Sequence, residues 1–304
     1  MDQAVKASVI IPTFNGAHKI VTLLDSLLLQ KERLFEVIIV VDGSTDDTHR
    51  IAENYRGRFL HFEVHNERNR GRAGARNFGA SKANSPILIF YDDDMEPDTL
   101  SVSKHLRFHA YHNGIVSGHT VEQEKSGNTD IQNYKARLSN KWLKHFPDTL
   151  FAMSFDNLFF ASANCSITRE TFTKLDGFDE RLPDAEDYDF AYRALCHDVP
   201  VYFDKTNRAI HHDKITCKGY IQRLRNYAKA QTILKNIHPE RDNYRGERKL
   251  NPAKKFIYRG FSASYWPRLI DNSVMLQALP KTVRYKLYDL IIQALAIEFP
   301  EKRL

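Results

Sequence analysis

Three adjacent aspartates, Asp92, Asp93 and Asp94, give the clearest chemical signal in the sequence. They follow directly on an apolar run at 87–91 (ILIFY). Adjacent carboxylates repel one another and are costly to pack unless a cation shares their charge. Carboxylate oxygens suit Mg²⁺ or Mn²⁺, and such ions commonly also hold substrate phosphates. Taken alone, the cluster fits a metal site and a solvated acidic turn equally well.

A second segment has the chemistry of phosphate binding. Residues 69–77 (NRGRAGARN) combine arginines with glycines at the expected start of a helix. Helix N-termini and guanidinium groups both favour phosphate. The segment matches neither the dinucleotide fingerprint nor the P-loop, so alone it is weak evidence.

Two further clusters suit proton transfer and metal binding. Glu186 and Asp187 lie at the expected start of a helix, where a carboxylate can act as general base for an acceptor hydroxyl. An acidic first turn also stabilises a helix through its dipole, and alone this structural role is favoured. His211 and His212 follow the last apolar segment, where an imidazole would complete a metal site formed with the aspartates. A single histidine among the 13 in the chain is weak evidence.

The elements that position these residues alternate between strand and helix. Strands are expected at 8–13, 36–41, 59–64 and 87–91, and helices at 20–28 and 71–84. This order predicts βαβ units and a mainly parallel sheet, in which ligands bind beyond the carboxyl ends of the strands. Asp42 and the aspartate cluster lie at such ends. Asp42, with Ser44 and Asp47 in a capping-box pattern behind it, fits a ligand-binding carboxylate or a helix-capping turn.

The later part of the chain is less regular. Strands are expected at 115–121 and 200–204, and helices at 186–196, 218–237 and 283–298. The polar residues 122–150 are interpreted as a long loop or small helices.

Composition bounds the class of protein. The 304 residues are 42% hydrophobic and 27% charged, as in folded globular proteins. Three widely spaced cysteines indicate neither a disulfide framework nor a zinc site. No run reaches the roughly 18 apolar residues needed to span a bilayer. We therefore expect a cytoplasmic protein.

Charge divides the chain near Thr216. Residues 1–215 carry 26 Lys and Arg against 31 Asp and Glu, whereas residues 216–304 carry 18 against 7. The change predicts a domain at 1–215, with halves 1–94 and 95–215, and a basic helical extension at 216–304.

Six segments between about residues 7 and 215 resemble, in order, the family 2 glycosyltransferases. They are SVIIPTFN (8–15), VIIVVDGSTDDT (37–48), NRGRAGARNFG (69–79), LIFYDDDMEPD (88–98), the acceptor region from NCSIT to AEDYDFAYRA (164–194), and AIHH (209–212). Each string is common alone, but all six in this order and spacing are specific. The resemblance implies the GT-A fold, a three-layer αβα arrangement with a mostly parallel central sheet, here followed by the helical extension.

The resemblance also implies a nucleotide-diphosphate sugar donor, with UDP the commonest nucleotide in the family. By position, the donor-binding residues would be Pro12, Thr13 and Phe14 around the nucleotide, Asp42 on the base, Arg76 near the phosphates, and Asp92 and Asp93. Asp92 and Asp94 match the two aspartates of the D-x-D motif. Asp94 would bind Mn²⁺ or Mg²⁺ directly, and Asp92 would bind it too or act through ribose or water.

The remaining roles concern the acceptor and the metal. Asp187 matches the aspartate of the E-D motif and would be the general base, with Glu186 positioning the acceptor. His211 fits the late metal-ligand histidine, with His212 as the alternative. A single displacement would invert the anomeric configuration. The acceptor would be a glycan or lipid-linked hydroxyl, in cell-surface polysaccharide or glycolipid assembly.

The basic extension matches no family motif and leaves three interpretations open. It fits a helical cap with a solvated surface, a peripheral contact with the inner face of the cell membrane, or a protein partner or self-association. The membrane interpretation is motivated by aromatic residues among basic ones: Tyr258, Phe261, Tyr265 and Trp266 among Lys254, Lys255, Arg259 and Arg268.

Other classes fit less well. The first turn, PTFNGAH, lacks the glycine-rich, lysine-containing loop of sugar nucleotidyltransferases, and no nicotinamide-binding fingerprint is present. No recognition motif supports nucleic-acid binding. An inactive nucleotide-sugar-binding protein on the same fold remains open, although Asp92, Asp94 and Asp187 are intact.

Overall fold

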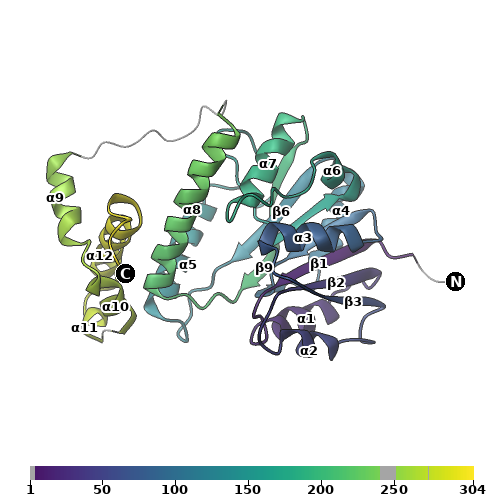
Figure 1. Ribbon diagram of the computed structural model, residues 1–304, viewed down its shortest axis with the longest axis horizontal. Helices are drawn as coiled ribbons and strands as arrows, with labels where there is room; N and C mark the ends of the chain where they lie inside the picture. The colour runs from purple at the N-terminus through teal and green to yellow at the C-terminus, as the bar shows by residue number, and fades with distance from the viewer. Residues whose placement is uncertain (1–3, 240–250, 273) are drawn as a thin grey trace. The chain divides into compact units, whose positions relative to one another are not determined.

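The computed structural model describes residues 4–239, 251–272 and 274–304, and these form two compact units (Figure 1). The first unit comprises Met1–Glu122 and Leu143–His212, and the second comprises Gln123–Trp142 and Asp213–Leu304. The sequence placed a single boundary near Thr216. In the structure the chain enters the second unit for the last time at Asp213, and residues 123–142 also belong to that unit.

The first unit is built on one nine-stranded sheet with the order β3-β2-β1-β4-β8-β6-β9-β5, to which β7 adds by pairing with β9. The strands are β1 (Ala7–Thr13), β2 (Phe35–Asp42), β3 (His61–Glu67), β4 (Ile87–Tyr91), β5 (Met95–Pro97), β6 (Ile115–Val121), β7 (Leu150–Ala152), β8 (Asn164–Thr168) and β9 (Val201–His211). β1 to β4 run parallel, β8 lies antiparallel between β4 and β6, and β9 pairs parallel with β6. The mostly parallel sheet confirms the predicted fold class.

Helices cover both faces of this sheet (Figure 1). One face packs against α3 (Gly71–Lys82), α6 (Arg169–Lys174) and α7 (Glu186–Cys196), and the other against α1 (Ile20–Leu28), α2 (Thr48–Glu53) and α4 (Ser101–Tyr111). Every residue of β1 and β2 is consequently buried, which accounts for their unbroken apolar sequences. The three layers place the carboxyl ends of β1, β2 and β4 at one edge.

Local details differ from the sequence expectations in two places. α2 begins at Thr48 after Asp47, and Ser44 does not cap it. The Ser44 hydroxyl instead accepts a hydrogen bond from the backbone N–H of Asn15 at 2.9 Å, which ties two strand-end loops together. Residues 122–150 contain a 14-residue helix, α5 (Asp130–Leu143), rather than a loop alone.

The second unit consists of helices around its own core. Besides α5 they are α8 (Cys217–Ile237), α9 (Pro252–Gly260), α10 (Tyr265–Asn272), α11 (Val274–Gln277), α12 (Lys281–Gln293) and the π-helical η1 (Ala294–Glu298). Asp130 on α5 accepts hydrogen bonds from Arg284 at 2.6 and 2.9 Å and from the hydroxyl of Tyr288 at 2.7 Å. These bonds, with Tyr134 packed against both tyrosines of α12, explain why α5 belongs to this unit. Among the described residues, no helix combines the length and the apolar character needed to cross a membrane.

Close packing of α3 on the sheet gives a test of the fold. A Cβ at Gly79 would lie 2.5 Å from Cγ2 of Ile10 and 3.2 Å from Cγ2 of Val40. We therefore expect Gly79→Ala to lower the free energy of unfolding by about 1–3 kcal/mol, since overpacking forces the helix off the strands. Gly127→Ala, where a Cβ meets nothing within 4 Å, is the control. Equal chemical-denaturation midpoints for both variants would contradict this account of the packing.

Candidate active site

The loop after β1 is fixed by the middle aspartate of the cluster. Asp93 is buried, accepts a hydrogen bond from the hydroxyl of Thr13 at 2.6 Å and pairs with Nζ of Lys19 at 2.7 Å. Burial raises the pKa of Asp93 to about 6, and Lys19 and Thr13 oppose that rise. Asp93 therefore holds the first turn against the end of β4. Phe14, on the same turn, is half exposed at 51%.

Asp42 ends β2 and binds the start of α3. Its carboxylate accepts a hydrogen bond from the backbone N–H of Arg70 at 2.6 Å, and its carbonyl accepts one from the side chain of Asn69 at 3.1 Å. Burial raises the pKa of this carboxyl, against the N–H groups of Arg70 and Gly71. The next residue, Gly43, has φ of 74° and lies so close to Asn69 that a side chain would clash. Asp42 thus caps α3 rather than the helix that follows it in sequence.

Arg76 lies at the centre of the site. Its side chain is 1% exposed, and it donates to Asp92 and to Glu186, both at 2.6 Å. Burial disfavours the charged guanidinium, but these two carboxylates outweigh burial and raise the pKa of Arg76. The arginine therefore joins the end of β4 to the start of α7, across 110 residues of sequence.

Asp187 follows Glu186 in the first turn of α7. Burial and the neighbouring Glu186 raise its pKa to about 7, and Arg76 opposes the rise. The preceding Ala185 has φ of 63°, a left-handed conformation that residues with a Cβ seldom adopt. Asp187 lies close to Arg76, because Glu186 beside it pairs with Arg76 at 2.6 Å and Asp187 and Arg76 each affect the pKa of the other.

Asp94 lies beside His211. Nε2 of His211 lies 3.5 Å from Oδ1 of Asp94, and Nδ1 of His211 lies 2.8 Å from Oε1 of Glu122. Burial lowers the pKa of the imidazole, but hydrogen bonds to the two carboxylates outweigh burial and raise it to about 10. The strand pairing explains the meeting, because His211 at the end of β9 is the register partner of Met95, which follows Asp94.

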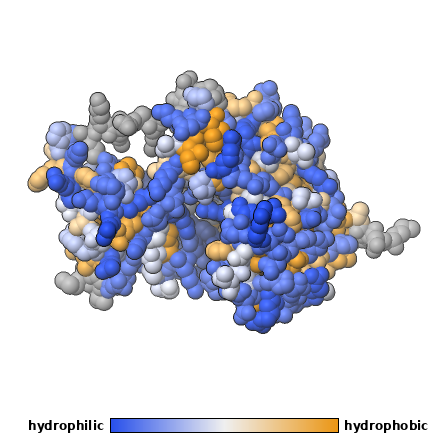
Figure 2. Space-filling model, viewed as in Figure 1, coloured by the Kyte–Doolittle hydropathy of each residue, from blue (hydrophilic) through white to orange (hydrophobic). Residues whose placement is uncertain are grey.

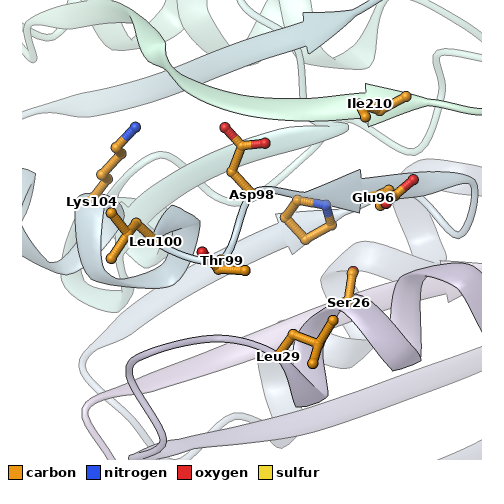
Figure 3. A pocket seen from close by; sticks show the side chains of 9 residues that line it. Ser26, Leu29, Glu96, Asp98, Thr99, Leu100, Lys104 and Ile210 are labelled. Carbon is orange, nitrogen blue, oxygen red and sulfur yellow. The ribbon is translucent and has the colours of Figure 1, made fainter.

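His212 points to a different place. Its Nε2 lies 2.5 Å from Oε2 of Glu96, while its backbone N–H donates to the carbonyl of Asp94 at 2.9 Å. Glu96 lines a separate cavity of about 340 Å³ between α1, β5 and α4. Figure 3 shows Asp98 and Lys104 on one side of this cavity and Ser26 and Leu29 from α1 on the other. Of the two histidines, the structure therefore brings His211 to the carboxylate of Asp94.

The donor set at Asp94 fits a small divalent cation in part. A carboxylate oxygen and an imidazole nitrogen are both ligands that Mn²⁺ accepts, and such ions complete their shells with water and phosphate oxygens. In the ranges that the structure describes, no group of three or more His, Cys, Asp and Glu residues is arranged to hold a metal ion. The carboxylate of Asp92 pairs with Arg76 through Oδ1, and its role toward a metal stays a prediction.

Two contributors were not identified from the sequence. Lys19 and Glu122 are charged partners supplied by the start of α1 and by the residue after β6. The sequence named Arg76 but not its bridge between Asp92 and Glu186, and its place near the nucleotide phosphates stays a prediction. A signal for Lys19 existed, because a buried Asp93 requires a cation and the first turn offers one, but no sequence pattern indicates Glu122.

Known relatives share parts of this chain. It is 37% identical over 112 residues to the glycosyltransferase YfnE of Bacillus subtilis, which is 36% of this chain and 29% of that protein. A glycosyltransferase of Haemophilus influenzae is 28% identical over 195 residues, 62% of this chain and 61% of its own length. Validoxylamine A glucosyltransferase of Streptomyces hygroscopicus is 27% identical over 220 residues, 64% of this chain and 52% of its own. The chain spans less than two thirds of the length of each of these relatives.

Solved structures share the fold over nearly the whole chain. TarS of S. aureus superposes with a TM-score of 0.55 at 19% identity, covering 98% of this chain and 91% of TarS. The mannosyltransferase PcManGT from Pyrobaculum calidifontis, in complex with GDP-Man and Mn²⁺, gives 0.58 at 20% identity, covering 99% and 89%. At these identities the likeness establishes the GT-A architecture.

The family is established by a match that covers most of the sheet-bearing unit. The model of glycosyl transferase family 2 matches residues 8–175, more than half of the chain and the region that contains Asp42, Arg76 and the aspartate cluster. With the strand-end carboxylates and the fold in agreement, the chain belongs to glycosyl transferase family 2.

Proposed function

We propose that this glycosyltransferase moves a sugar from a nucleoside-diphosphate donor, UDP-sugar in the first instance, to an acceptor hydroxyl with inversion at the anomeric carbon. The observation that carries the proposal is the pair of short ion pairs from buried Arg76 to Asp92 and Glu186. They fix the end of the donor strand β4 against the helix that bears Asp187. A donor carboxylate, a cationic bridge and a base candidate are thereby held in one cluster.

The donor pocket would form around the strand ends of β1 and β2. Pro12 and Thr13 are buried, and Asp93 with Lys19 fixes their turn, so the exposed ring of Phe14 is the side chain of this turn that can contact a base or ribose. The carboxylate of Asp42 lies at the same edge of the sheet, where a nucleotide would meet it. UDP is the first choice because solved complexes of the TarS fold carry UDP and UDP-GlcNAc.

The proton that the transfer reaction releases can be accepted by a residue of this chain. The acceptor hydroxyl gives its proton to the carboxylate of Asp187 as its oxygen bonds to the anomeric carbon, and the bond from that carbon to the diphosphate oxygen breaks. Attack opposite the leaving group inverts the anomeric configuration. Mn²⁺ or Mg²⁺, held by Asp94 and His211 with Asp92 nearby, would neutralise charge that develops on the diphosphate. Glu186 forms an ion pair with Arg76, so its proposed role is to position the site and not to transfer a proton.

The acceptor is proposed to be a glycan or lipid-linked hydroxyl, with a role in cell-surface polysaccharide or glycolipid assembly. One relative supports a lipid acceptor by its name: the cholesterol galactosyltransferase of Borreliella burgdorferi is 32% identical over 89 residues, 29% of this chain and 25% of its own. The match covers less than a third of either protein.

Nucleotide binding tests the proposal first. We expect calorimetry to show UDP binding that requires Mn²⁺ and is lost in Asp94→Ala, since that carboxylate is the proposed metal ligand. Glu96→Gln, on the adjoining strand and paired with His212, is the matched control and should bind UDP as the parent does. Selective binding of GDP would indicate a GDP-sugar donor and leave the proposed reaction unchanged. Absence of binding to either nucleotide, with or without metal, would indicate an inactive protein on this fold.

Product analysis tests the stereochemistry. With a donor of known anomeric configuration, proton NMR of the product should show the opposite configuration at the transferred sugar. Retention would contradict the single displacement, and hydrolysis of the donor between the phosphates would point to a nucleotidyltransferase-like reaction instead.

A further inference from the structure

Helix α9 of the second unit has an apolar stripe that faces solvent. Ala253, Phe256, Ile257 and Gly260 recur at i, i+3, i+4 and i+7, which places them on one side of the helix. Phe256 is 80% exposed and Ile257 is 49% exposed. Tyr258, which lies on the opposite side of the helix, is the one half-buried residue of α9. The helix therefore packs against its own unit with the side that carries the fewest apolar residues.

This orientation is the reverse of an ordinary surface helix, whose apolar stripe faces the core. α9 packs against α12 and η1 within its unit, so it is held in place while its apolar side stays outside. Figure 2 shows hydrophobic surface next to hydrophilic surface in the region of α9, at the left of the view. The aromatics that follow α9 behave differently, because Phe261 and Trp266 pack on each other at 5.6 Å and join the core of the unit.

Basic side chains border the apolar stripe. Lys254 lies at one edge of it and Arg259 at the other, Lys255 lies on the opposite side of the helix with Tyr258, and all three basic residues are exposed. The segment 251–260 contains no acidic residue. α9 therefore presents apolar side chains flanked by basic ones at the surface of a basic unit. This arrangement is complementary to an anionic lipid bilayer, which has charged headgroups outside and an apolar interior.

We propose that α9 is a docking helix for an anionic lipid surface. Phe256 and Ile257 enter the boundary between headgroups and acyl chains, and Lys254 and Arg259, at the two edges of the stripe, contact the lipid phosphates. A nucleic acid would bind the basic side chains but would gain little from contact with Ile257. A lipid surface would bind both the basic and the apolar side chains. The inference rests on the exposure and charge of α9 and is independent of the transfer reaction.

Vesicle flotation of the full-length protein tests this directly. We expect binding to vesicles of phosphatidylcholine with phosphatidylglycerol at low salt, and little binding to phosphatidylcholine alone. Replacing both apolar residues, in Phe256→Ser with Ile257→Ser, should lower the partition coefficient by at least about tenfold, because two large side chains lose their burial in lipid. Charge reversal in Lys254→Glu with Arg259→Glu should lower it by at least about tenfold as well.

Two control pairs distinguish binding through α9 from nonspecific hydrophobic adsorption and from nonspecific electrostatic attraction. Leu60→Ser with Tyr111→Ser removes two exposed apolar side chains from the first unit, and Lys218→Glu with Lys229→Glu makes the same charge change on α8 of the second unit. Both pairs should keep most of the parent's vesicle binding. Unchanged UDP binding and circular dichroism in all variants would show that each protein is folded.

Three outcomes would overturn the proposal. They are no binding to anionic vesicles at low salt, equal binding to uncharged vesicles, and an equal loss in the α8 control. Concentration-dependent self-association that disappears in the Phe256 and Ile257 variant would assign the stripe to a second copy of the chain. Retention of RNA at physiological salt that depends on the basic side chains alone would assign it to nucleic acid.

Discussion

Replacing Asp187 with asparagine should lower kcat by about 10²–10⁴-fold and leave the affinity for UDP nearly unchanged. Asparagine keeps the size and most hydrogen bonds of the side chain but cannot take the proton of the acceptor hydroxyl. The donor side, around Asp94 and Phe14, would be untouched. The measurement is initial-rate transfer with a saturating UDP-sugar, combined with calorimetry of UDP binding.

The control for this variant is Asp184→Asn. Asp184 lies just before α7, where its carboxylate accepts a hydrogen bond from the backbone N–H of Ala185 at 2.9 Å and lies 3.9 Å from Arg72. Its kcat should stay near the parent value. A rate for Asp187→Asn within twofold of the parent would remove Asp187 from proton transfer and leave the base unassigned.

The pH profile follows from the same carboxyl. Burial and Glu186 raise the pKa of Asp187 to about 7, so a growing fraction is protonated and inactive as the pH falls through that value. We expect kcat/KM to fall below about pH 7 and to level off above it, until other groups titrate. A rate that is flat from pH 5 to 8 would show that this carboxyl is ionised throughout.

Arg76→Met should be the most destabilising single change at the site, lowering the free energy of unfolding by about 3–5 kcal/mol. Methionine fills similar volume but leaves Glu186, which is 3% exposed, without its charge partner inside the protein. Asp92 loses its partner as well and is free to swing toward Asp94. The measurement is denaturant unfolding followed by a probe in the sheet-bearing unit.

Rescue distinguishes a lost ion pair from a simple loss of packing. Arg76→Met with Glu186→Gln should recover a substantial part of the stability, since the second change removes the buried charge. Activity should not return, because the bridge to the donor strand is still missing. Arg181→Met, which breaks an exposed ion pair with Asp179, should change stability little. A double variant no more stable than Arg76→Met would show that packing alone accounts for the loss.

Much of the sheet could be predicted from sequence because its strands are buried on both faces. β1, β2 and β4 appear as short apolar runs, and the strand at 115–121 and the helix at 186–196 match their observed bounds. The short β5 and β7 could not be found this way. Each is only three residues long and exists because β9 offers an edge to pair with. The bounds of α5 were not predicted, and 122–150 was left as a long loop or small helices, because this polar helix packs through few buried residues, Ile131, Tyr134 and Ala136.

The site was predictable in its parts and not in its connections. Asp42, the aspartate cluster and the E-D pair lie where the sequence placed them, at strand ends and at a helix start. The pairing of Arg76 with Glu186 and that of His211 with Glu122 depend on tertiary contacts between segments about 90 to 110 residues apart. No local pattern specifies such pairs. The roles of these residues in donor binding, metal binding and proton transfer stay predictions until the variants are measured.

The bridge made by Arg76 has a consequence for how the protein is synthesised. Arg76 and Asp92 are translated long before Glu186, which lies 110 residues after the arginine. Until that glutamate leaves the ribosome, the guanidinium lacks the hydrogen-bond acceptor that Glu186 provides, and burying its unsatisfied N–H groups is unfavourable. The nucleotide half of this sheet should therefore stay open on the nascent chain and close only when α7 arrives, so an N-terminal fragment ending before residue 186 should not form a stable nucleotide-binding module on its own.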